Sequence, residues 1–508
     1  MQRLETRWEN KKGFKDSRVQ EMVAPSFNEG DAVRRQYMPT LHIFNGGFME
    51  RGRMVEEMAK IVGKENVLSS ETDLMLYGYD ASLFKGRPDC IVLPGSTEEV
   101  SKIVKFSHQE GIPIIARGSG TNLSGGTVPT RGGIILHFSR MNRILEIDIE
   151  NQRAVVEPGV FTLLLKNQLA RYGYVYQPDP ASEKVSTFGG NFGENSGGPH
   201  CLKYGVTTNH ILGAEVVLYD GKVIQAGGKA LDNPGYDLTG LLVGSEGTLG
   251  IATKLIVRIM PKPESVKTML AIYNSLEDAG KTVSAIIADG IMPATLEMLD
   301  KLTIKAVEES IHAGFPLDAE AVLLIELDGL KDGMERLAER IMEICKKNNA
   351  REVKAAKTEA ERMQLWAGRK GAFGAIARLR PNYLVCDGTV PRTKLPEVLT
   401  KVMEVGRKYE LTIANVFHAG DGNLHPLILF DERNEEELRK VHLAGSEILK
   451  ICVDAGGTIS GEHGIGTEKM KEMFFVFTPQ DIAAMGKVKR AFDPEDVYNP
   501  GKVLPKMP

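Results

Sequence analysis

The sequence predicts an α+β protein built in two main parts, and three observations support this fold class. Between residues 90 and 122, a buried strand, an amphipathic helix, a second buried strand and a glycine turn follow one another, an order typical of mixed helix and sheet folds. Proline and charged residues at 261–264 indicate a domain boundary. Beyond it, helical patterns such as 333–348 alternate with strand patterns such as 321–329 and 425–430, which predicts a second α+β domain with an open sheet.

Local signals define several elements of the first part. Apolar residues at helical spacing predict a short amphipathic helix from residue 54, which ends at Gly63. A second helix begins at Ser96, where Glu99 completes a capping box, and ends at Gly111. The Asp220-Gly221 pair lies between two strand patterns and predicts a β-hairpin.

The composition excludes several classes of protein. The 508 residues include 63 Lys and Arg and 67 Asp and Glu. The chain therefore has no excess of positive charge that would favour binding to nucleic acid or to an anionic membrane. No apolar run approaches the ~18 residues of a membrane span, and the N-terminus lacks the apolar stretch of a signal peptide. The cysteines lie far apart without a CxxC motif, which excludes a disulfide framework, a zinc ribbon or an iron–sulfur cluster held by this chain and predicts a cytoplasmic protein.

Three glycine clusters, at 117–122, 189–198 and 244–250, suggest close approach of the backbone to a ligand. The first follows a strand, where backbone N–H groups and the hydroxyls of Ser119 and Thr121 can surround an anion such as pyrophosphate; a tight turn is the alternative. No GxGxxG opens a helix here and no Gly-Lys-Ser or Gly-Lys-Thr ends the loop, which disfavours NAD and ATP. The three clusters together predict a cofactor with a long body.

A second set of residues predicts a metal site. His418 and His425 flank a Gly-Asp-Gly-Asn turn between two apolar strands, so they should lie nearly opposite across a hairpin, with Cβ atoms about 5 Å apart. Two imidazoles at that spacing suit one divalent ion, and Glu462 offers a carboxylate with His463 beside it. Such a set leaves coordination positions open for substrate. The alternative is a pair of ordinary surface or core histidines.

Three segments resemble the flavin-contacting segments of the vanillyl-alcohol oxidase and p-cresol methylhydroxylase family: PGSTEEVSKIVKFSHQEGIPIIARGSGTNLSGG, FGGNFGENSGGPHCLKYGVTTNHILG and YDLTGLLVGSEGTLGIAT. Over about 60–505, the chain is similar to the D-2-hydroxyacid dehydrogenase branch of that family, which includes the glycolate oxidase catalytic subunit and FAD-linked D-lactate dehydrogenases. The resemblance implies a two-part PCMH-type FAD-binding domain, a ferredoxin-like substrate (cap) domain with an antiparallel sheet, and a C-terminal helical segment that returns to the flavin.

The resemblance and the linker together predict four segments. An N-terminal arm covers residues 1–53, and the FAD-binding domain covers 54–264. The substrate domain with the metal site covers 265–477. The C-terminal segment, 478–508, packs on the FAD-binding domain.

By the same resemblance, FAD is bound by residues from all three glycine clusters, from the turn before the Ser96 helix and from the C-terminal Tyr-Asn-Pro motif. These residues are Pro94, Gly95, Arg117, Gly118, Ser119, Gly120, Thr121, Asn122, Gly190, Asn195, Gly197, Gly198, Glu246, Gly250, Ile251 and Asn499. Some relatives attach the flavin through a histidine near the first glycine loop, but RGSGTNLSGG contains neither His nor Cys. We therefore expect a non-covalent, dissociable flavin.

His418, His425 and Glu462 match the metal ligands of the D-2-hydroxyacid dehydrogenase branch, and His463 matches its proposed base. The resemblance leaves the metal open among Zn, Fe and Mn. Arg369 follows a Trp-containing helical segment as in the relatives, and a guanidinium suits a substrate carboxylate.

Three neighbouring cations, Lys370, Arg378 and Arg380, compete with Arg369 for this assignment. Phe373 and Val385 stand where 2-hydroxyglutarate enzymes of the family have polar residues, which favours a short monocarboxylic substrate.

The predicted function is FAD-dependent oxidation of a small D-2-hydroxy acid, D-lactate or glycolate, to the 2-oxo acid, with metal assistance and hydride transfer to flavin N5. Electrons then pass to a partner: an iron–sulfur subunit, an electron-transfer flavoprotein or a quinone-linked protein, through which the chain could also associate with a membrane. The alternatives are a D-2-hydroxyglutarate-type dehydrogenase, a metal-dependent hydrolase, a non-redox flavoenzyme of the alkylglycerone phosphate synthase type and a catalytically silent subunit. The oligomeric state is open.

Overall fold

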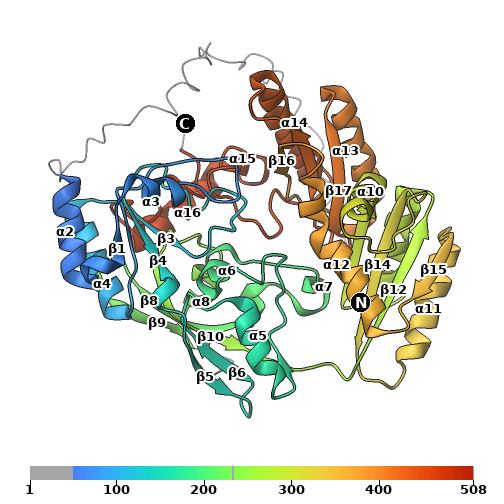
Figure 1. The fold of residues 1–508 in the computed structure, drawn as a ribbon, viewed down its shortest axis with the longest axis horizontal. Helices are drawn as coiled ribbons and strands as arrows, with labels where there is room; N and C mark the ends of the chain where they lie inside the picture. The colour runs from blue at the N-terminus through green and yellow to red at the C-terminus, as the bar shows by residue number, and fades with distance from the viewer. Residues whose placement is uncertain (1–49, 231–233, 507–508) are drawn as a thin grey trace, which may run out of the picture. The chain divides into compact units, whose positions relative to one another are not determined.

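The computed structural model describes residues 50–230 and 234–506, and the described chain combines helices with several sheets (Figure 1). Helix α2 (Arg51–Val62) begins slightly before residue 54, where the sequence pattern places its start, and Gly63 follows it with a positive φ of 89°. Residues 1–49 of the predicted N-terminal arm, 1–53, lie outside the described residues.

The first half of the chain contributes two main sheets and a short strand pair. The first sheet has the order β1 (Val67–Leu68), β2 (Cys90–Val92), β4 (Ile134–His137), β3 (Ile114–Arg117), and β4 runs parallel to both β2 and β3. The second has the antiparallel order β5 (Ile144–Asp148), β6 (Arg153–Val156), β10 (Ile251–Arg258), β8 (Ile211–Val217), β9 (Val223–Gly227). Strands β7 (Tyr174–Val175) and β11 (Met260–Pro261) pair separately. As predicted, β8 and β9 form a hairpin around Asp220 and Gly221.

Helix α4 (Thr97–Glu110) packs on the first sheet through Val100, Ile103 and Val104. Its N-terminus differs slightly from the predicted capping box. The Ser96 hydroxyl accepts the Glu99 N–H at 3.2 Å, but the Glu99 carboxylate accepts the N–H of Gly95, at 2.7 Å, instead of that of Ser96. The side chain therefore secures the turn that enters the helix.

The second half forms one antiparallel sheet in the order β15 (Glu352–Ala355), β12 (Ser265–Tyr273), β14 (Ala321–Gly329), β13 (Thr295–Asp300), β17 (Thr412–His418), β18 (Pro426–Phe430), β16 (Asn382–Val385). Apolar side chains cover both faces. One face packs against α9 (Leu276–Ala288), α11 (Met334–Lys347), α13 (Leu395–Tyr409) and α14 (Glu435–Asp454), and the other against α10 (Lys301–Ser310) and α12 (Glu359–Ile376).

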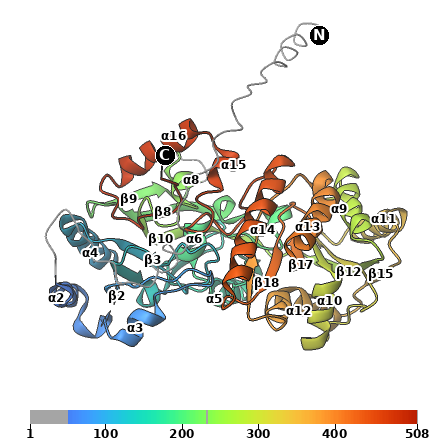
Figure 2. The ribbon, with the colours of Figure 1, turned by 90° about the horizontal axis from the view of Figure 1, so that it is seen from above.

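The C-terminal segment returns to the first half of the chain, as predicted: α16 (Pro479–Phe492) is drawn on the same side as the elements of that half in Figures 1 and 2, and it lines one cavity together with α8 (Leu238–Leu242). Tyr498 forms a parallel bridge with Ile114 of β3, and its hydroxyl donates to the Val217 carbonyl at 3.0 Å. The Asn499 amide donates to the carbonyls of Gly126 and Glu246, both at 2.7 Å. The end of the chain thereby ties together two of the glycine loops.

The remaining helices are short and connect these layers. They are α3 (Glu71–Leu76), α5 (Thr162–Ala170), α6 (Phe188–Glu194), α7 (Cys201–Tyr204) and α15 (Met473–Val476).

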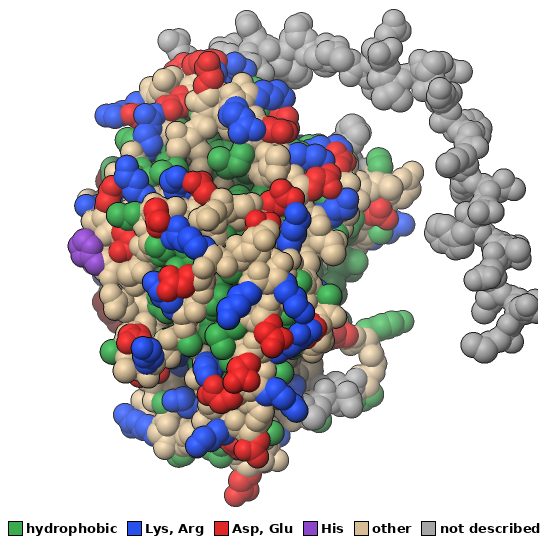
Figure 3. Space-filling view, turned by 90° about the vertical axis from the view of Figure 1, so that its right-hand side faces the viewer, with side chains coloured by type: hydrophobic (Ala, Val, Ile, Leu, Met, Phe, Trp, Pro, Cys, Tyr) green, Lys and Arg blue, Asp and Glu red, His purple; other side chains and the backbone are tan. Residues whose placement is uncertain are grey.

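The surface shows no preference for one sign of charge on the face drawn in Figure 3, where basic and acidic side chains are interspersed. None of the described helices is long and apolar enough to cross a membrane. The domain boundaries at 53, 264 and 477 stay a prediction. The two main sheets of the first half draw their strands from residues before 264, and the third draws its strands from residues after it.

Candidate active site

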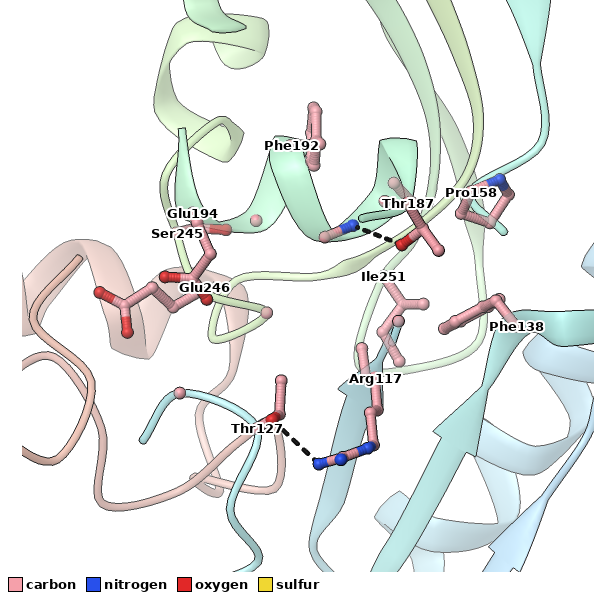
Figure 4. A pocket seen from close by; sticks show the side chains of 18 of the residues that line it. Arg117, Thr127, Phe138, Pro158, Thr187, Phe192, Glu194, Ser245, Glu246 and Ile251 are labelled. Carbon is pink, nitrogen blue, oxygen red and sulfur yellow. Dashed lines mark hydrogen bonds between the residues drawn. The ribbon is translucent and has the colours of Figure 1, made fainter. Parts of the chain in front are cut away.

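Two adjoining cavities lie where the glycine loops meet the histidine motifs. The wide cavity, about 440 Å³, is lined by residues 118–123 and by several residues between 180 and 199 of the first half, and by Arg369, His418, His425, Glu462 and His463 of the second. The narrow cavity, about 60 Å³, lies between the three glycine clusters (Figure 4). The residues that line both are Gly118, Thr127, Thr187, Gly190 and Glu194.

The first glycine loop follows β3 directly. A β-carbon at Gly118 would lie 2.3 Å from the Thr187 hydroxyl oxygen, so this position requires glycine. Asn122 folds the loop, because its Oδ1 accepts the N–H groups of Ser124, at 2.9 Å, and Gly126, at 2.7 Å. The loop therefore presents its backbone to the cavities at a fixed distance from α6.

The residues predicted to bind FAD fall into two groups. Most line at least one cavity: Arg117, Gly118, Ser119, Gly120, Thr121, Asn122, Gly190, Gly197, Glu246, Gly250 and Ile251. The others, Pro94, Gly95, Asn195, Gly198 and Asn499, line neither cavity. Asn195 ends α6 with a φ of 53°, and its side chain accepts the Thr208 N–H at 2.8 Å. Asn499 donates to the carbonyls of Gly126 and Glu246 and so positions residues that line the narrow cavity.

The strand pair β17 and β18 brings the two predicted imidazoles together. His418 pairs with Asn423, and His425 lies two residues further on the same face, so the rings meet diagonally and not directly across the hairpin. Their centroids are 5.2 Å apart. Both Nε2 atoms face one oxygen, Oε1 of Glu462, at 3.2 and 3.0 Å. The predicted set therefore converges on one point.

Glu297 supports this set from the neighbouring strand. It pairs in register with His418 across β13 and β17, is completely buried, and contacts His418 Nδ1 at 2.9 Å. Burial alone would raise the pKa of Glu297, but the Arg369 guanidinium and the His418 imidazole hold it below its usual value. Burial lowers the pKa of His418, yet Glu297 and Glu462 outweigh it and raise that pKa well above its usual value. The position between the carboxylates thus favours a cation.

Asp387 fixes the turn that carries Glu462 and His463. This buried carboxylate accepts the backbone N–H groups of Gly461 at 3.1 Å and His463 at 2.9 Å, and the Lys469 ammonium at 3.1 Å. The His463 ring stacks on His425 with centroids 4.8 Å apart and planes 7° apart. Burial is the main reason that the pKa of His463 falls to about 4, so this imidazole is neutral at pH 7.

Two contacts join this turn to the first half of the chain. The Glu246 carboxylate accepts the N–H groups of Ile465 and Gly466, both at 2.7 Å. A β-carbon at Gly197 would lie 2.5 Å from the Glu462 carboxylate. The second glycine cluster therefore lies directly against the histidine–glutamate set.

Arg369 lines the wide cavity from α12 and is only 2% exposed. Its Nε donates to Glu297 at 2.6 Å, and its Nη2 lies 2.5 Å from the same carboxylate. Lys370 also lines the cavity but pairs with Glu183 at 2.7 Å. The cavity lining includes neither Arg378 nor Arg380.

Sequence reasoning missed several residues of the site. Thr187 contacts Gly118, Glu194 lines both cavities, and Glu297 and Asp387 hold the histidine motifs. Thr187 is the N-cap residue of α6, and a threonine before a helix is a capping signal that the sequence itself displays. Glu194 ends a helix, Glu297 lies on a strand and Asp387 lies in a loop. Each becomes recognisable only through its approach to residues that are distant in the sequence.

The fold is shared with solved structures of other proteins. The structure of p-cresol methylhydroxylase with bound substrate superposes with a TM-score of 0.77 at 20% identity, covering 90% of this chain and 97% of that one. At this identity the likeness concerns the fold, which is the predicted one with its antiparallel sheets.

Comparison of sequences identifies the family. Residues 88–227 match the model of the FAD binding domain, and residues 262–503 match the C-terminal domain of FAD linked oxidases. The glycolate oxidase subunit GlcD of Escherichia coli (strain K12) is 45% identical over 87% of this chain and 89% of its own length. A D-lactate dehydrogenase of Archaeoglobus fulgidus is 36% identical over 82% and 91%. The chain belongs to the FAD-linked oxidase family, which confirms the resemblance and FAD as the cofactor.

We predict that Gly118→Ala weakens FAD binding about tenfold or more, because the added methyl group meets the Thr187 hydroxyl and must move the loop or α6. The dissociation constant is measured by titrating the apoprotein with FAD and following flavin fluorescence. Gly52→Ala is the control, because nothing lies within 4 Å of the added carbon. Equal affinities in wild type and Gly118→Ala would contradict the assignment of this loop.

Proposed function

We propose that this chain oxidises a small D-2-hydroxy acid, D-lactate or glycolate, to the 2-oxo acid. The observation that carries the proposal is the wide cavity, where the glycine loops face the arginine, histidine and glutamate side chains of the second half. The relatives named glycolate oxidase subunit and D-lactate dehydrogenase support the same class of reaction.

When bound, FAD supplies the two-electron acceptor, and a divalent ion, Zn, Fe or Mn, supplies a Lewis acid that makes the substrate hydroxyl more acidic. His418, His425 and Glu462 would hold the ion. Their arrangement fits one, because Glu297 engages Nδ1 of His418 and leaves Nε2 directed at Glu462, the usual support for a metal-bound imidazole. The residues of the glycine clusters would hold FAD without a covalent bond.

His463 is the group that we assign to accept the hydroxyl proton. It is neutral at pH 7, lines the wide cavity and lies beside His425, so a ring nitrogen is available as a base. Asp387 holds its backbone N–H, which keeps the ring at the cavity wall. A fixed base contributes typically 10²- to 10⁴-fold to a rate.

Arg369 is the residue that we assign to the substrate carboxylate. Glu297 engages Nε and Nη2, and this leaves Nη1 to donate to a ligand. Phe373 lines the same cavity, and the centroid of its ring lies 6.1 Å from that of His425. An apolar ring at this position supports a short substrate with one carboxylate. Val385 is buried in the core and does not line the cavity.

Lys370 is the residue that supports the alternative substrate, D-2-hydroxyglutarate, because it places a second cation at the cavity. The Lys370 Nζ atom forms an ion pair with Oε1 of Glu183 at 2.7 Å, and it lies 3.9 Å from Oδ2 of Asp179. The pairing favours a substrate with one carboxylate.

We predict that D-lactate or glycolate bleaches the visible flavin spectrum of the purified holoenzyme under anaerobic conditions, and that L-lactate does not. Stopped-flow absorbance measures the rate, with D-2-hydroxyglutarate as the alternative substrate. His463→Ala should slow bleaching about 10²- to 10⁴-fold without loss of FAD. His442→Ala, an exposed histidine on α14, is the matched control. Equal bleaching by both lactate enantiomers would refute the stereochemical assignment.

We predict that the holoenzyme contains a divalent metal and that Glu297→Gln lowers metal affinity about 10- to 100-fold, since His418 loses the partner of its Nδ1. Metal content is measured by mass spectrometry after dialysis against graded chelator. His418→Ala should lose the metal, and chelation should slow bleaching until Zn, Mn or Fe is restored. A metal-free wild type with full activity would show the assignment to be wrong.

We also propose that electrons leave through a partner: an iron–sulfur subunit, an electron-transfer flavoprotein or a quinone-linked protein. The cysteines are spaced widely in the sequence, and Cys90, Cys201, Cys345, Cys386 and Cys452 are all free in the structure. The name of the E. coli relative also describes a subunit. We propose that the chain is located in the cytoplasm and that it can associate with a membrane through that partner.

We predict that affinity purification from the native host recovers the chain with a redox-active protein that accelerates reoxidation of the substrate-reduced flavin. The rate is measured with and without that protein. The partner proposal fails if the isolated chain passes electrons to its physiological acceptor at the full rate.

A further inference from the structure

Glu194 is the last residue of α6 and, among the described residues, the one ionisable side chain that lines both cavities. Its Oε2 is buried and has no hydrogen-bond partner in the described structure. Figure 4 shows its carboxyl group beside that of Glu246. A β-carbon at Gly464 would lie 2.6 Å from Glu194 Oε2 and 2.8 Å from Glu246 Oε1. The two carboxyl groups therefore close around the glycine that follows His463.

The two carboxyl groups have different partners. Glu246 accepts two backbone N–H groups, from Ile465 and Gly466, and such bonds favour the ionised form. Glu194 has no comparable donor at Oε2. When two carboxyl groups lie this close, one of them usually keeps a proton, and the partners of Glu246 make Glu194 the one that keeps it.

The other charged groups around Glu194 agree with this assignment. Burial raises the pKa of Glu194 well above its usual value, and Glu246 and Asp80 raise it further, against the Asn122 amide and the Lys469 ammonium. Lys469 is already paired with Asp387.

Lys502 also faces this group. Its ammonium donates to the Gly125 carbonyl at 2.7 Å and to the Thr467 hydroxyl at 2.6 Å. Neither lysine therefore forms a direct ion pair with Glu194.

We propose that Glu194 holds a proton in the holoenzyme, so that Glu194 and Glu246 together bear one negative charge beside the flavin cavity. This inference rests on FAD binding against the glycine clusters, as in the proposed function. Reduction adds electrons to the flavin, and every ionised carboxylate nearby opposes that addition. A neutral Glu194 therefore makes the flavin easier to reduce by a hydroxy acid.

The test compares wild-type holoenzyme with Glu194→Gln and Glu194→Leu. Infrared spectroscopy should show the C=O band of a protonated carboxylic acid in wild type at neutral pH, and this band should be lost in both variants. The flavin midpoint potential of Glu194→Gln should match that of wild type at neutral pH. Toward alkaline pH, the wild-type potential should fall below that of Glu194→Gln at the pH where the band disappears, because only wild type gains a charge.

Glu468→Gln is the control. Burial raises the pKa of Glu468 to about 7, but this residue lines neither cavity, so its replacement should leave the flavin potential unchanged. The inference is overturned if the band difference is absent, or if Glu194→Gln has a higher potential than wild type at neutral pH. If Glu194→Gln does not fold, Glu194→Leu decides by the same two readouts. A wild type that binds FAD but is not reduced by any hydroxy acid would instead refute the proposed function.

Discussion

The turn between Gly461 and Gly466 is held from both sides by buried carboxylates, and the rest of the site depends on this arrangement. Asp387 accepts N–H groups at the start of the turn, and Glu246 accepts the N–H groups of Ile465 and Gly466 at its end. Charge-assisted hydrogen bonds to backbone are stronger than neutral ones. The turn carries Glu462 and His463, so both side chains are positioned relative to the two halves of the chain at once.

This double attachment explains how residues far apart in sequence form one cavity. The sheet of the second half supplies His418, His425 and Glu297 on neighbouring strands, and the glycine loops of the first half approach closely because Gly118 and Gly197 have no side chain. Any larger residue at Gly197 would collide with Glu462. Sterics and buried charge therefore act together in fixing the distance between the cofactor loops and the histidines.

Local sequence patterns predicted much of this arrangement. Cap residues and glycines located α4 and the first glycine loop, and the Gly-Asp-Gly-Asn turn correctly predicted a hairpin between His418 and His425, although the two histidines lie diagonally and not nearly opposite. The diagonal offset of the imidazoles was not predictable, because it depends on the pairing of His418 with Asn423. Glu297 was missed because it lies 121 residues from His418 in sequence and meets it only through strand pairing. Glu194 was missed because a carboxyl group at a helix end gives no sign of the crowding around it.

The return of the C-terminal segment has a consequence for biosynthesis. Ile114 bonds to the backbone near Tyr498, and Asn499 links the loops at Gly126 and Glu246. A growing polypeptide cannot make these contacts until Tyr498 and Asn499 have left the ribosome, although domains generally fold in order as they emerge. The amino-terminal half therefore stays without these contacts until the segment around Tyr498 has been translated, and a product truncated before that segment would lack them.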